Sequence, residues 1–105
     1  MTDTDVHALA AALTKKLADE GKLVEAGFAA MQVIMLRGAS EGQISDMRLA
    51  YMAGAEHVFS SMMSVLDPGE EPTDADMKRV ELIYTELQRW REVLAARVAR
   101  AKGRA

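Results

Sequence analysis

The sequence of 105 residues contains no cysteine, only two prolines and few aromatic side chains. Without cysteine, a disulfide scaffold, a thiolate metal site and a cysteine nucleophile are all excluded. The sequence also lacks any useful run in which apolar and polar residues alternate, which is the pattern of a half-buried strand. These absences predict a fold that contains neither a sheet nor covalent cross-links.

Long apolar segments are absent as well. The first apolar stretch, residues 6–13, is short and follows acidic residues, so it does not have the pattern of a signal peptide. The longest stretch, residues 23–36, is interrupted by Glu25 and Gln32 and is too short to span a bilayer. Together with the lack of cysteine, these features favour a cytoplasmic protein that does not insert into a membrane.

The residues that are abundant favour helices. Half of the chain is apolar, 28% is charged, and Ala, Leu, Met, Glu, Lys and Arg are frequent. We therefore predict an all-α fold, a small up-down helical bundle of three to four helices with a long C-terminal helix. Residues 1–105 are expected to form this single helical-bundle domain, because the chain is long enough for one modest core.

Breaks in the pattern predict helices over residues 4–20, 22–37, 41–66 and 73–101. Gly21 either ends the first helix or lies inside one continuous helix. Ser40 with Gln43, and Thr73 with Asp76, have the spacing of N-terminal capping boxes.

Two helices carry conspicuous apolar surfaces. The last helix has a stripe with steps of three and four residues, formed by Val80, Ile83, Leu87, Trp90, Leu94 and Val98. The second predicted helix is apolar nearly all round, so we expect the other helices to wrap it or a second subunit to cover it. A homodimer in which the central helices pack together satisfies this need, with self-association through Phe28, Met31 and Met35.

Charge is distributed unevenly along the chain. Residues 1–90 contain eight Lys/Arg and fifteen Asp/Glu, a balance of −7, whereas residues 91–105 contain five and one, a balance of +4. The acidic body argues against specific nucleic-acid binding, which needs a basic footprint. We expect the basic tail to fray over residues 100–105. Leu82 and Val93 form a minor second apolar patch on the last predicted helix. We predict that this patch and the basic tail form a partner-binding surface, made of Leu82, Val93, Arg97, Arg100, Lys102 and Arg104.

His57 is the main candidate for chemistry. Metal sites on helices place ligands three or four residues apart, but Ala53, Gly54, Ser60 and Ser61 occupy those positions around His57. We therefore expect a solvated histidine, no catalytic residue, no metal and no cofactor.

Arg48 intrudes into an apolar helical face. We expect it to extend along that face to reach water, and the alternative is an ion pair with Glu25.

Residues 47–59 (MRLAYMAGAEHVF) and 66–73 (LDPGEEPT) resemble small helical proteins of bacterial and prophage genomes. The resemblance covers about a quarter of the chain. It implies a bacterial or phage setting and carries no functional residue.

The sequence favours a non-enzymatic protein–protein interaction module that self-associates. Two alternatives stay open: a phage-encoded, anti-defence inhibitor of a host protein machine, and a small metal-binding or enzymatic protein that uses His57.

Overall fold

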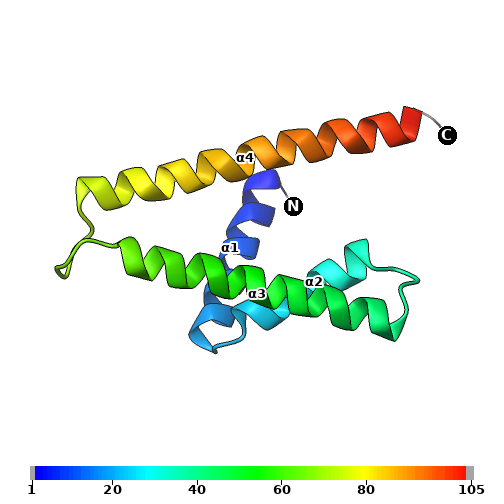
Figure 1. Cartoon of the computed structure of the whole chain (residues 1–105), viewed down its shortest axis with the longest axis horizontal. Coiled ribbons are helices and arrows are strands. Elements are labelled where there is room, and N and C mark those ends of the chain that lie inside the picture. Colours follow the sequence, from blue (N-terminus) through cyan, green and yellow to red (C-terminus); the bar gives the residue numbers. More distant parts are fainter. Residues whose placement is uncertain (1, 104–105) are drawn as a thin grey trace. The chain divides into compact units, whose positions relative to one another are not determined.

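A computed structural model describes residues 2–103, which form four helices and no strand (Figure 1). The helices are α1 (Asp3–Asp19), α2 (Leu23–Met35), α3 (Glu41–Val65) and α4 (Asp74–Gly103). This confirms the predicted all-α class and the long last helix. The chain divides after Ser60 into two compact units, and each unit is described by itself.

Local signals define the ends of α1. Thr2 and Asp5 form a reciprocal capping box at its start, which the sequence analysis had missed. At its end, Gly21 has a φ of 71°, and its N–H donates to the carbonyl of Ala18 while the N–H of Lys22 donates to that of Leu17. This is a Schellman motif, in which glycine adopts the left-handed conformation at little cost. Gly21 therefore separates α1 from α2.

Both predicted capping boxes are present. The N–H of Gln43 donates to Ser40 Oγ, and the Gln43 side chain accepts from the Ser40 N–H. Thr73 and Asp76 make the same exchange at the start of α4. Each pair satisfies two of the N–H groups that lack partners in the first turn of a helix.

Phe28 on α2 is the central packing residue of the first unit. It is only 3% exposed and is the one large hydrophobic residue that is buried among residues 2–103. Its ring packs on that of Tyr51 from α3, with ring centroids 5.6 Å apart and tilted by 57°. The contact requires a close approach, because a Cβ at Gly27 would overlap the Tyr51 hydroxyl.

The rest of α2 departs from the expectation that the other helices wrap it. Within the first unit, Val33, Ile34 and Met35 are between 63% and 76% exposed. Glu25 and Phe28, which contact α3, lie in the first half of α2, and the C-terminal turn beyond them is exposed. Cover by a second subunit stays a prediction.

The second unit contains the last turn of α3, a connecting segment and α4. With 30 residues, α4 is roughly 45 Å long. It continues through Gly103, so the predicted frayed segment, residues 100–105, is helical as far as it is described. The packing of α4 along α3 in an up-down bundle stays a prediction.

Candidate functional site

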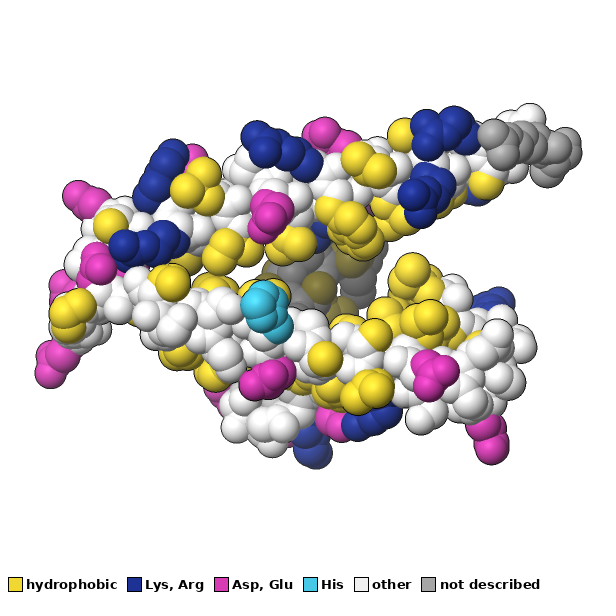
Figure 2. Space-filling view, in the orientation of Figure 1, with side chains coloured by type: hydrophobic (Ala, Val, Ile, Leu, Met, Phe, Trp, Pro, Cys, Tyr) yellow, Lys and Arg dark blue, Asp and Glu magenta, His cyan; other side chains and the backbone are white. Residues whose placement is uncertain are grey.

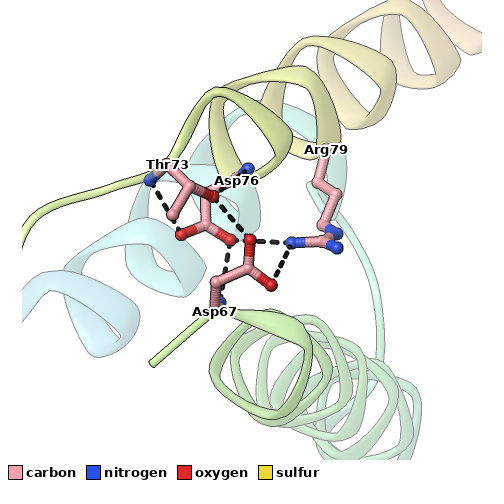
Figure 3. Close-up of polar contacts among 4 residues, drawn as sticks. All are labelled: Asp67, Thr73, Asp76 and Arg79. Atoms are coloured by element: carbon pink, nitrogen blue, oxygen red, sulfur yellow. Dashed lines mark hydrogen bonds and ion pairs between the residues drawn. The ribbon is translucent and has the colours of Figure 1, made fainter. Parts of the chain in front are cut away.

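A compact polar cluster joins the end of α3 to the start of α4 (Figure 3). Its centre is the carboxylate of Asp76, a residue that is only 3% exposed. Asp76 Oδ1 accepts hydrogen bonds from the Asp67 N–H at 2.9 Å and from Arg79 Nη1 at 2.8 Å, and Oδ2 accepts from the Thr73 N–H at 3.1 Å. The Thr73 hydroxyl donates to Asp67 Oδ2 at 2.6 Å, and Arg79 Nη1 lies 3.3 Å from Asp67 Oδ1.

These donors shift the ionisation of Asp76. The backbone N–H of Asp67 is the main cause that lowers the pKa of Asp76, and the donors on Thr73 and Arg79 act in the same direction. Burial opposes them, because it disfavours the charged form. Asp76 is therefore held as a carboxylate that closes the connecting segment onto the first turn of α4.

The cluster has little capacity left for a ligand. Both oxygens of Asp76 are occupied, the Thr73 hydroxyl donates and accepts within the cluster, and Arg79 neutralises part of its negative charge. Among residues 2–103, no buried side-chain polar atom lacks a hydrogen-bond partner. We therefore assign the cluster to structure rather than to binding or catalysis.

A second polar contact lies in the first unit, between α2 and α3. Both terminal nitrogens of Arg48 donate to the two carboxylate oxygens of Glu25, and the guanidinium carbon lies 5.6 Å from the centre of the Phe28 ring. The alternative ion pair with Glu25 is therefore formed, and the Arg48 side chain is still 44% exposed, so its guanidinium also reaches water as expected. The pair lowers the pKa of Glu25 and raises that of Arg48, mainly through the hydrogen bonds themselves.

The first candidate binding surface is the C-terminal turn of α2 and the loop that follows it. A shallow groove there is lined by Met35, Leu36, Arg37, Gly38, Ala39, Gln43 and Met47. Met35 and Met47 are both exposed beside it. Methionine side chains adapt easily to different partner shapes, so this groove suits a contact with another protein.

The second candidate surface is the apolar stripe of α4, formed by Val80, Ile83, Leu87, Trp90, Leu94 and Val98. Figure 2 shows hydrophobic side chains at the surface along this helix. Val80, Leu87 and Trp90 are between 44% and 58% exposed, and Ile83 and Leu94 are half-buried. The second unit by itself therefore leaves the stripe largely open.

The residues predicted for self-association have different environments in the first unit. Phe28 is buried against Tyr51, so its ring is already used within the chain. Met31 is half-buried, and Met35 is exposed at the groove after α2.

The residues predicted for partner binding lie on α4, except for Arg104, which falls outside the described residues. Leu82 and Val93 are 56% and 59% exposed. Arg97, Arg100 and Lys102 are exposed in the last turns of the helix.

His57 lies exposed on α3. In the range that the structure covers, no group of three or more His, Asp or Glu side chains is arranged to hold a metal ion. None of the helices within that range is both long enough and apolar enough to cross a bilayer.

Comparison of the chain with protein-family models, with curated proteins and with solved structures found no match.

Proposed function

We propose that this protein is a non-enzymatic protein–protein interaction module and that it self-associates. The observation that carries the proposal is the small amount of apolar burial. Phe28 is the one large hydrophobic residue buried in the described part of the chain, whereas the C-terminal turn of α2 and the stripe of α4 are open to solvent.

Single exposed apolar residues are common on protein surfaces, but contiguous ones mark interaction sites. In each unit several large apolar side chains of one helix are exposed: Val33, Ile34 and Met35 around the C-terminal turn of α2, and Val80, Leu87 and Trp90 along one face of α4. Burial of a Val, Leu or Met side chain contributes roughly 1.5–3 kcal/mol. Covering either set therefore provides a substantial driving force for association.

A second copy of the chain is the partner that is always present at the same concentration. Two identical surfaces pair around a two-fold axis, and this is the commonest form of association among soluble oligomers.

Sedimentation equilibrium across the micromolar range tests the proposal. We expect a mass above the 11.5 kDa of one chain, and a melting temperature that rises with protein concentration because association stabilises the folded state. A single species of 11.5 kDa throughout this range, with a melting temperature independent of concentration, refutes self-association.

A further inference from the structure

The exposed stripe of α4 has the spacing of a coiled-coil seam. Val80, Ile83, Leu87, Trp90 and Leu94 follow one another at steps of three, four, three and four residues. This places them at alternating a and d positions of a heptad, where side chains of one helix insert between those of a partner helix. Leu82 lies on a different face of the same helix, because it occupies a c position in this register.

The charge of α4 changes sign along its length. Residues 74–88 contain four acidic and two basic side chains, a balance of −2. Residues 89–103 contain five basic and one acidic side chain, a balance of +4. Two such helices lie about 8–10 Å apart when packed, which is close to the screening length of about 8 Å at physiological salt. An antiparallel pair brings opposite charges together, whereas a parallel pair aligns the two basic halves.

We infer that the stripe of α4 binds α4 of a second copy in antiparallel orientation, about a two-fold axis that passes between Gln88 and Arg89. This inference rests on the proposed self-association and specifies its surface. The axis lies at the midpoint of Asp74–Gly103, so the two helices overlap over their whole length.

The antiparallel register pairs apolar side chains throughout the centre of the seam. Leu87 lies opposite the partner's Trp90, and Ile83 lies opposite the partner's Leu94. At each end Val80 lies opposite the partner's Arg97, whose aliphatic stem covers the valine while its charged group reaches water. A parallel pair instead places Arg97 against the partner's Arg97 within the seam, where two like charges repel.

Two leucines of α4 provide a matched test of the surface. Leu87 is 53% exposed and lies in the seam, whereas Leu82 is 56% exposed and lies outside it. We expect Leu87→Glu to raise the dissociation constant of the dimer at least about tenfold, because lost burial of one leucine already corresponds to such a change. Leu82 was predicted for contact with another partner and not for self-association, so Leu82→Glu should leave the dissociation constant of this dimer unchanged. Circular dichroism should show the same helix content for both variants.

The outcomes of this test separate the inference from the proposed function. A wild-type monomer in sedimentation overturns both. A wild-type dimer that is weakened equally by both substitutions, or by neither, overturns the α4 seam and leaves self-association standing through another surface.

Disulfide cross-linking tests the orientation, and the natural absence of cysteine makes single-cysteine variants specific. An affinity-tagged Val80→Cys variant is mixed with an untagged Arg97→Cys variant and oxidised. In the antiparallel pair these two positions face each other, whereas the two copies of position 80 lie about 25 Å apart, far beyond the roughly 7 Å limit between the Cα atoms of a disulfide. We expect the mixed product to predominate. Predominance of the Val80→Cys homodimer, or no cross-linked product at all, overturns the antiparallel register.

Discussion

The close approach of Gly27 to Tyr51 yields a prediction in which the sign of a stability change depends on one oxygen atom. In an open helix, replacing glycine by alanine stabilises by about 1 kcal/mol, because glycine loses more conformational freedom on folding. At Gly27 the added methyl group overlaps the Tyr51 hydroxyl. Since the Tyr51 ring also packs on Phe28, moving it away disturbs the one buried large hydrophobic contact that the structure describes.

Overpacking of this kind costs about 1–3 kcal/mol, which outweighs the gain in helix propensity. We therefore expect Gly27→Ala to lower the free energy of unfolding by about 1 kcal/mol. Tyr51→Phe removes the overlapping oxygen and leaves ring atom Cζ at 3.4 Å from the new Cβ, an ordinary van der Waals distance. In that background Gly27→Ala should raise the free energy of unfolding by about 1 kcal/mol.

The double-mutant cycle therefore predicts a coupling of about 2 kcal/mol between the two positions. Urea unfolding followed by circular dichroism, at one fixed protein concentration, measures all four variants. Tyr51→Phe alone is the control and should have a small effect, because it keeps the ring that packs on Phe28 and removes only the hydroxyl. The reasoning is refuted if Gly27→Ala stabilises the wild type as much as it stabilises the Tyr51→Phe variant.

Three further predictions concern the polar contacts. Thr73→Ala should destabilise the helical fold by about 1 kcal/mol through loss of the α4 N-cap, whereas Thr73→Ser should retain it; thermal unfolding distinguishes the two. Because the folded pKa of Asp76 is lowered, its stabilising contribution is complete above its unfolded pKa of about 3.9 and is lost as the pH falls below that value. In an acid titration, the free energy of unfolding of Asp76→Asn should therefore depend less on pH than that of the wild type. Arg48→Gln should lower the melting temperature more at low salt than at high salt, because it removes the charge that pairs with Glu25; equal effects at both salt concentrations contradict an ionic role.

The candidate residues divide between those that local patterns revealed and those that they did not. The α4 stripe was visible from its spacing, and Val80, Leu87 and Trp90 of the stripe are exposed in the structure. Asp67 lies in the irregular segment between α3 and α4, and its N–H and carboxylate both contribute to the cluster around Asp76. No spacing rule predicts that contact, because it joins residues nine positions apart across an irregular segment.

The sequence by itself determined where α3 and α4 begin, and it limited the end of α1 to two alternatives at Gly21. Capping boxes at Ser40 and Thr73 and the left-handed glycine at position 21 act between residues at most five positions apart, so they depend on no distant contact. The tertiary structure decided which long side chains meet. Glu25 and Arg48 are 23 positions apart, and they meet because α2 packs on α3 at Phe28. The same packing placed Phe28 inside and left the end of α2 exposed, because burial depends on neighbouring helices and not on the apolar character of one helix alone.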